Sequence, residues 1–114
     1  MNIGFEAKRV FHNKTGLGNY SRDLIRLLRQ YFPENNYYLY NPKDSKEILF
    51  TANNKNVFEK KPSTSFYLKF YNLWRQKGIV NDLKKDNITL FHGLSGELPA
   101  GLRSKNIKSI VTIH

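Results

Sequence analysis

The feature that most constrains the fold is a strand, a turn and a helix within residues 1–32. Residues 2–6 are predicted to form a short β-strand, and a polar loop leads from it to Gly16 and Gly18. A helix is predicted at 19–32, where apolar side chains recur at helical spacing; they are Tyr20, Leu24, Leu27, Leu28 and Tyr31. A strand that leads through a glycine turn into a helix indicates an α/β unit.

The rest of the chain continues this alternation. Strands are predicted at 37–40, 56–59, 87–92 and 107–114, and helices at 66–77 and 79–85. Because strands alternate with helices, we expect an α/β fold with a parallel sheet covered on both faces. The 114 residues fit one domain, 1–114. The last predicted strand is apolar and should lead into another element, so we expect the chain to be the front part of a longer protein.

The composition is strongly basic and free of cysteine. Lysine and arginine number 19 against 9 acidic residues, a formal net charge of +10. This balance favours an anionic partner, such as nucleic acid, an anionic membrane surface or a phosphorylated small molecule. The lack of cysteine excludes thiolate metal sites and thiol nucleophiles and fits a reducing cytoplasm. Three histidines, at 12, 92 and 114, come without paired carboxylates at ligand spacing, so we expect no metal and no cofactor.

The glycine turn is a candidate anion site. A helix that follows such a turn presents unpaired backbone N–H groups and the positive end of its dipole to a phosphate or carboxylate. Gly16 and Gly18 would let that ligand approach the backbone closely. The third glycine of the dinucleotide fingerprint and the lysine of a P-loop are both missing. A tight loop with a helix cap at Asn19 explains the same residues without a ligand.

Four segments, taken in order, resemble the start of group 1 glycosyltransferases, which are retaining nucleotide-sugar enzymes of the GT-B fold. They are the N-terminal strand, the turn and helix start at 15–25, the segment 91–99 and the ending 111–114. The resemblance implies a Rossmann-like N-terminal domain that mainly binds the acceptor, with the active site in a cleft against a second domain. It also implies transfer of a hexose from a nucleotide-diphosphate sugar to a saccharide or lipid-linked acceptor in cell-surface polysaccharide synthesis, without a metal.

The resemblance assigns roles to particular residues. His114 would be the catalytic residue, a strand-end histidine that contacts the donor sugar. Gly16, Gly18, Asn19 and Tyr20 would bind the donor phosphate or the acceptor across the cleft. On this interpretation Gly18→Val would cripple turnover of the full-length enzyme and leave the fold intact.

The resemblance also places His92 and Gly93 at the edge of the same cleft, because ligands of open α/β sheets gather at the carboxyl ends of strands. A strand-end histidine bonded to the backbone is an equally good explanation of His92. The paired glutamates of the family's donor site belong to its second domain and have no counterpart here. We therefore expect this chain alone to be inactive.

The segment predicted as a helix at 66–77 interleaves aromatic with basic side chains. A core helix covering the sheet is the favoured interpretation, and docking at an anionic membrane surface is the alternative. Together with the resemblance, this predicts a cytoplasmic protein, peripheral at the inner face of the membrane. A strand left at the edge of the sheet would also allow self-association.

A different class of function remains open, namely a non-catalytic basic α/β module that binds nucleic acid or another polyanion. Its support is the charge and a stripe of Arg22, Arg26 and Arg29 on the outer face of the first long helix. Against it stands the lack of a nucleic-acid-binding motif, so the transferase interpretation expects no nucleic acid among the partners.

Overall fold

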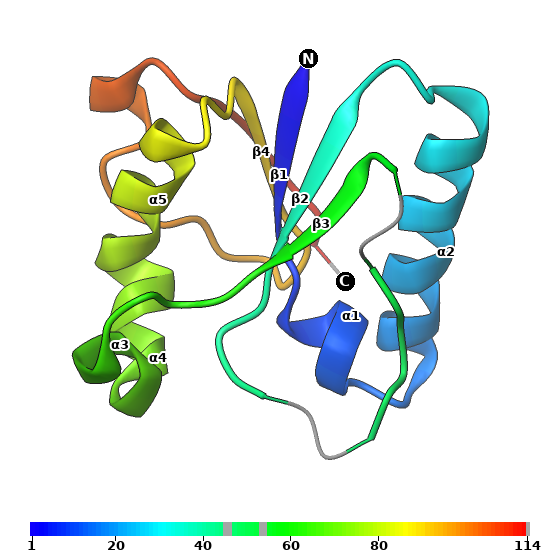
Figure 1. Ribbon diagram of the computed structural model, residues 1–114, viewed down its shortest axis with the longest axis horizontal. Coiled ribbons are helices and arrows are strands. Elements are labelled where there is room, and N and C mark those ends of the chain that lie inside the picture. Colours follow the sequence, from blue (N-terminus) through cyan, green and yellow to red (C-terminus); the bar gives the residue numbers. More distant parts are fainter. Residues whose placement is uncertain (45–46, 53–54, 114) are drawn as a thin grey trace.

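The computed structural model describes residues 1–44, 47–52 and 55–113, and it shows an α/β fold. A parallel sheet of five strands lies between two layers of helices (Figure 1). The strands are β1 (Asn2–Glu6), β2 (Asn36–Tyr40), β3 (Val57–Lys60), β4 (Leu90–Gly93) and β5 (Lys108–Val111). The helical segments are α1 (Lys8–His12), α2 (Gly16–Tyr31), α3 (Ser65–Lys69), α4 (Tyr71–Leu73), the π-helical turn η1 (Trp74–Gly78), α5 (Ile79–Lys85) and the 3-10 turn η2 (Arg103–Lys105).

The strand order is β3-β2-β1-β4-β5, and every neighbouring pair is parallel. The chain builds outward from β1 to β3, crosses back over the sheet through α3 to α5, and continues on the other side of β1 with β4 and β5. Helices α1 and α2 lie on one face of the sheet and α3, α4 and α5 on the other (Figure 1). The expected Rossmann-like α/β architecture is therefore confirmed.

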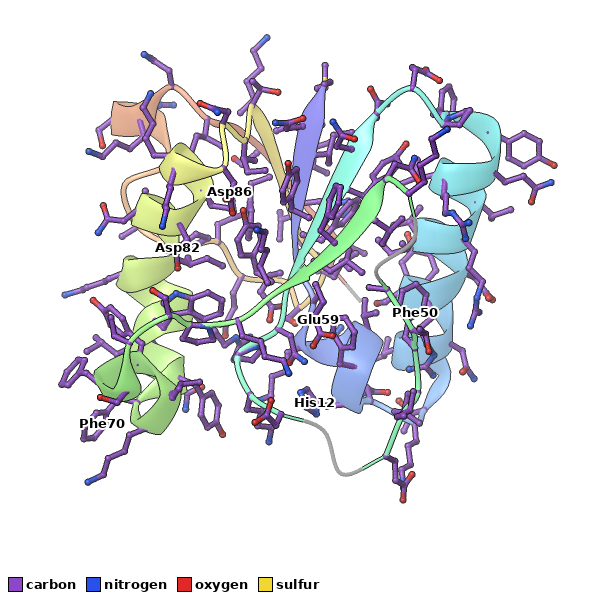
Figure 2. The ribbon with its side chains drawn as sticks, in the orientation of Figure 1. His12, Phe50, Glu59, Phe70, Asp82 and Asp86 are labelled. Atoms are coloured by element: carbon purple, nitrogen blue, oxygen red, sulfur yellow. The ribbon has the colours of Figure 1, made fainter. Side chains whose placement is uncertain are left out.

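Two hydrophobic cores hold the layers together, one on each face of the sheet. The core under α1 and α2 contains Phe5, Ile25 and Leu39. The core under α5 contains Trp74 and Leu83, and two polar bonds anchor it at the side of α5 that faces the sheet (Figure 2). Those bonds run from the Trp74 indole N–H to Asp82, at 2.7 Å, and from the Tyr40 hydroxyl to Asp86, also at 2.7 Å.

Several predicted element boundaries are wrong. Helix α1 was not predicted, since five residues are too few to show a hydrophobic period. The helix expected at 66–77 is broken into α3, α4 and η1. The two last strands are shorter than expected, and the predicted end of the final one, His114, lies outside the described residues.

The buried face of α2 also differs from the prediction. Of the apolar side chains that recur at helical spacing, Tyr20, Leu27 and Tyr31 are 46%, 51% and 66% exposed. The side of α2 that is buried carries Gly18, Ser21, Arg22 and Ile25. Small residues near the start of α2 let it lie close to α1, and of the apolar side chains along α2, Leu24 and Leu28 pack partly buried against the core.

The edges of the sheet are formed by β3 and β5. Strand β5 pairs only with β4, and Ile110 on it is half exposed. Self-association through this edge stays a prediction.

Candidate functional site

A polar pocket of about 340 Å³ lies at the carboxyl ends of β1 and β4. At this point the strand order reverses, since β2 and β3 are added on one side of β1 and β4 and β5 on the other. In an open parallel sheet this crossover leaves a crevice between loops that diverge to opposite faces, and ligands bind there. The described residues that line the pocket are Lys8, Arg9, His12, Asn13, Arg75, Ser95 and Glu97. They come from α1, from η1 and from the loop after β4, three segments distant in sequence.

Glu6, the last residue of β1, organises this pocket from beneath. Its carboxylate is almost fully buried and accepts hydrogen bonds from Arg75 Nε at 3.1 Å, from the backbone N–H of Lys8 at 3.1 Å and from the Ser95 hydroxyl. A buried carboxylate needs such partners, because an unpaired buried charge is strongly destabilising. Glu6 therefore ties α1, η1 and the loop after β4 to the end of β1.

Arg75 reaches Glu6 from a π-helical turn on the opposite helical layer. Its side chain is only 14% exposed, and Glu6 holds it through one nitrogen. π-helical turns place side chains out of the ordinary helical register and are frequent at functional sites. The neighbouring Trp74 anchors the same turn in the core, so the guanidinium is presented to the pocket from a rigid base.

The loop after β4 folds back over the end of its strand. A Cβ placed on Gly93 would lie 2.2 Å from the Glu97 carbonyl oxygen, so only glycine permits this close approach. Gly96 turns the chain with a φ of +80°, in the region that favours glycine. The fold-back brings Ser95 onto Glu6 and places Glu97 at the pocket wall.

Helix α1 supplies most of the positive charge. The Arg9 guanidinium donates to the Leu94 carbonyl at 3.3 Å, and the Lys8 ammonium lies 5.7 Å from the centre of the Tyr71 ring. With Arg75 these make three cations in the pocket. Two carboxylates oppose them, Glu97 among the described lining residues and Glu6 beneath the pocket, so one positive charge remains in excess. An excess of cations in a polar crevice suits an anionic ligand.

His12 is oriented by a chain of hydrogen bonds toward β2 and β3 (Figure 2). Its Nε2 lies 2.8 Å from Asn41 Oδ1 and 3.1 Å from the Lys43 carbonyl oxygen. Both partners are oxygens, so Nε2 carries the proton and donates. The Asn41 amide in turn donates to Glu59 at 2.8 Å, which fixes which way that amide points.

The predicted glycine turn is arranged differently from expectation. Helix α2 begins at Gly16 with Thr15 as its N-cap, so Asn19 lies inside the helix and is not the cap. The Gly18 N–H donates to Asn13 Oδ1 at 3.1 Å, and a Cβ on Gly18 would lie 2.0 Å from the Asn13 carbonyl oxygen. Gly18 therefore serves helix packing, and its N–H is already bound by the chain.

The other residues predicted for that turn lie on its outer side. Nothing among the described residues comes within 4 Å of where a Cβ on Gly16 would stand, so its backbone is open to an approaching group. Asn19 and Tyr20 are exposed, and Asn19 accepts a hydrogen bond from Arg22 at 2.7 Å. Neither Gly16, Asn19 nor Tyr20 is among the described residues that line the pocket.

His92 and Gly93 lie at the carboxyl end of β4, as the resemblance implies. The His92 side chain, however, packs against those of Phe5 and Thr112 and is not among the described residues that line the pocket. Its Nε2 is bonded to the Thr112 hydroxyl, and its ring centre lies 5.5 Å from that of Phe5. Burial in these surroundings lowers the pKa of His92 below its usual value. The partner is a side chain rather than the backbone that the alternative explanation predicted. The predicted catalytic residue, His114, lies outside the described residues.

The predicted arginine stripe is wrong in one member. Arg22 is only 6% exposed, and its guanidinium donates to the Val10 carbonyl at 3.1 Å and to the Asn13 carbonyl at 2.8 Å. It therefore satisfies carbonyls at the end of α1. Arg26 and Arg29 remain exposed. The polyanion-binding interpretation thus loses one of its three supporting arginines.

Sequence reasoning missed the residues that build the pocket. Glu6 ends the first strand and Lys8 and Arg9 follow it, and their position at a carboxyl strand end was a usable signal. Arg75 and Ser95 both bond to Glu6, from 69 and 89 positions away in the sequence. No local sequence pattern predicts pairs at such separations.

The described part of the chain contains no helix with the length and apolar character to cross a bilayer. Among the same residues, no three metal-ligating side chains are grouped so that they could hold an ion. Comparison with protein-family models, with curated proteins and with solved structures gives no match for this chain.

Proposed function

We propose that this chain is the acceptor-side, Rossmann-like part of a retaining glycosyltransferase of the GT-B fold. It would take part in transfer of a hexose from a nucleotide-diphosphate sugar to a saccharide or lipid-linked acceptor. The proposal starts from the resemblance of four segments to group 1 glycosyltransferases. The observation that carries it is the cationic pocket at the β1/β4 crossover, the place where an α/β domain of this order binds ligands.

The chemistry of the pocket suits a diphosphate, the group that a nucleotide sugar and a lipid-linked saccharide share. Lys8 and Arg9 would bind phosphate oxygens directly, since guanidinium and ammonium groups form charge-assisted hydrogen bonds with them. Arg75 donates through Nε to Glu6 and through one terminal nitrogen to Asn72 Oδ1, at 3.5 Å, and its other terminal nitrogen has N–H groups to donate to a ligand. Cations held in place before the reaction stabilise the charge that develops on a departing diphosphate without a metal.

The other proposed contacts rest on the resemblance. Gly16 would leave room for a ligand at the start of α2, and its open surroundings are compatible with that role. His114 would contact the donor sugar as the catalytic residue. The protein would act in the cytoplasm, with peripheral attachment to the inner face of the membrane.

Binding is tested by isothermal titration calorimetry of the 114-residue chain with UDP, with GDP and with a short-chain polyprenyl diphosphate. We expect at least one of these diphosphates to bind, and the double variant Lys8→Gln/Arg9→Gln to weaken it about tenfold, or about 1.4 kcal/mol. Because Arg9 also supports the loop through Leu94, Lys8→Gln is measured alone as well.

The matched controls are Lys84→Gln for the single variant and Lys84→Gln/Lys85→Gln for the double variant, which remove the same charge from exposed positions on α5. The pocket assignment fails if none of the three diphosphates binds, or if the controls weaken binding as much as the pocket variants do. The transferase assignment is tested by reading the gene beyond codon 114. A following α/β half with a glutamate pair supports it, and an immediate stop codon overturns it.

A further inference from the structure

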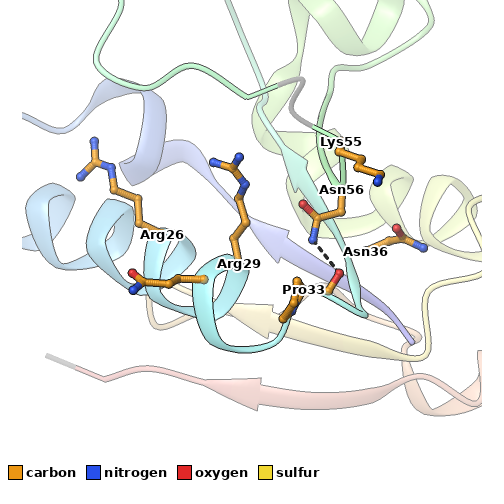
Figure 3. A pocket seen from close by; sticks show the side chains of 7 residues that line it. Arg26, Arg29, Pro33, Asn36, Lys55 and Asn56 are labelled. Carbon is orange, nitrogen blue, oxygen red and sulfur yellow. Dashed lines mark hydrogen bonds between the residues drawn. The ribbon is translucent and has the colours of Figure 1, made fainter.

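A second basic pocket lies at the amino ends of the strands, whereas the candidate site lies at their carboxyl ends. It measures about 780 Å³, and the described residues that line it are Arg26, Arg29, Gln30, Pro33, Asn36, Lys55 and Asn56 (Figure 3). Asn36 begins β2 and Asn56 directly precedes β3, so the pocket sits at the amino ends of these strands. None of its lining residues is shared with the pocket at the carboxyl edge.

The base of this pocket is held by backbone and amide hydrogen bonds. The Asn56 side chain donates to the Pro33 carbonyl at 3.2 Å and to the Asn35 carbonyl at 3.1 Å, the first of which Figure 3 shows. The Asn36 amide donates to Asn2 Oδ1 at 3.1 Å. These bonds join the turn after α2 to the start of β3, so the two walls of the pocket are fixed relative to each other.

Two of the three cations on the pocket walls have no ion pair with a described residue. Arg26 and Arg29 project from α2 on one side, and Lys55 stands on the other (Figure 3). Arg26 has an exposed ion pair with Asp23, at 3.1 Å. Neither Arg29 nor Lys55 has an ion pair with any described residue, and no carboxylate is among the described residues that line the pocket.

Stabilisation of the end of α2 does not account for this cluster. Cations near a helix C-terminus interact favourably with its dipole, which gives Arg29 one structural purpose. The terminal carbonyls of Leu28 and Phe32, however, already accept hydrogen bonds from the Tyr37 hydroxyl, at 3.1 and 2.8 Å. Lys55 comes from a different segment and contributes nothing to the helix end. The convergence of cations from two walls needs another reason.

Phosphate groups are the anions that best match the arginine and lysine side chains of this pocket. Arg26 and Arg29 are three positions apart on one helix and so lie on the same face. Arg29, which has no ion pair with a described residue, can bind a phosphate in bidentate fashion, and Arg26 adds a charge that it shares with Asp23. Lys55 adds a point charge from across the pocket. A volume of about 780 Å³ matches that of a small-molecule site. A ligand with a single phosphate would leave at least one wall unneutralised.

We propose that this pocket is a second anion site, which binds a ligand carrying two or more phosphate groups, independently of the candidate site at the carboxyl edge. The phosphates can belong to a soluble molecule or to a lipid headgroup. The inference does not depend on glycosyltransferase activity, because it uses a separate set of residues.

Tripolyphosphate is the probe, titrated into the intact chain by calorimetry and followed by amide chemical shifts. We expect shifts at Arg29 and Lys55, and a loss of affinity of about twentyfold in Arg29→Gln/Lys55→Gln. Tripolyphosphate can also bind at the carboxyl-end pocket, so Lys8→Gln/Arg9→Gln is the background for the titration; it should keep the shifts at Arg29 and Lys55, which separates the two sites. Lys84→Gln/Lys85→Gln in the same background controls for net charge. Thermal unfolding checks that each variant is folded.

The proposal is overturned if Arg29→Gln/Lys55→Gln binds tripolyphosphate no more weakly than Lys84→Gln/Lys85→Gln. Vesicles of phosphatidylcholine with and without a phosphoinositide bisphosphate identify the source of the phosphates. Cosedimentation that needs the phosphoinositide and is lost in Arg29→Gln/Lys55→Gln supports a lipid headgroup, and tripolyphosphate binding without cosedimentation supports a soluble ligand. A single-stranded oligonucleotide that binds this pocket more tightly than tripolyphosphate overturns the small-ligand assignment in favour of nucleic acid.

Discussion

Arg22→Met offers a sharp test of how α1 and α2 are joined. Methionine fills most of the arginine stem but removes the guanidinium that donates to the Val10 and Asn13 carbonyls. A buried carbonyl that loses its partner costs about 2 kcal/mol, and a partly wetted one about 1 kcal/mol. The bond to Val10 is buried and that to Asn13 is partly buried, so we expect a total loss of about 3 kcal/mol in the free energy of unfolding.

Such a loss is a large fraction of the stability of a domain of this size, about 5–15 kcal/mol. With a urea m-value of about 2 kcal/mol per molar, the unfolding midpoint followed by circular dichroism should fall by about 1.5 M. Arg29→Met is the matched control, because it is the same substitution at an exposed position of α2 and should cost under about 1 kcal/mol. If both variants have equal midpoints, the guanidinium does not join the two helices and the argument from buried carbonyls is refuted.

Two further predictions concern a glycine and a histidine. Gly18→Ala should lower the free energy of unfolding by about 2 kcal/mol or more, because its Cβ would lie 2.0 Å from the Asn13 carbonyl oxygen. Gly16→Ala, the control, should be neutral or stabilise by up to about 1 kcal/mol. Equal urea midpoints for the two variants would contradict the close packing at Gly18. The loss expected for Gly18→Ala reverses the expectation that Gly18→Val leaves the fold intact. Burial lowers the pKa of His92 in the folded state, so the unfolded state binds more protons as the pH falls through about 6.5, and stability should drop there. The drop, measured as urea midpoints between about pH 7 and 5, should be smaller in His92→Gln, and an unchanged pH profile would show that His92 is not its source.

Hydrophobic periodicity made the order of the elements predictable. Strand β1 is central and buried from Ile3 to Glu6, although only Ile3 and Phe5 in it are large apolar residues. The alternation of strands with helices indicated a parallel sheet. The helix expected at 66–77 failed for a physical reason. Its aromatic side chains are spread around most of the helix circumference, so the pattern does not distinguish a buried face from an exposed one. In the structure α3 and α4 contain no buried residue.

Local chemistry also misled at the start of α2. The glycines were interpreted as an opening for a ligand, since glycine leaves the backbone bare. The same property allows another backbone to come close, and at Gly18 the neighbour is Asn13. Nothing within a few residues distinguishes these two uses of glycine.

The sequence by itself determined the fold class and the edge of the sheet where a site would lie, because both follow from the periodicity of apolar residues and from where strands end. Only the tertiary structure decided which residues meet at that edge. The pairing of Glu6 with Arg75 and the burial of Arg22 against α1 depend on contacts between elements. A charged side chain shows in the sequence only its charge, and whether it faces solvent, a carbonyl or a ligand is decided by what packs against it.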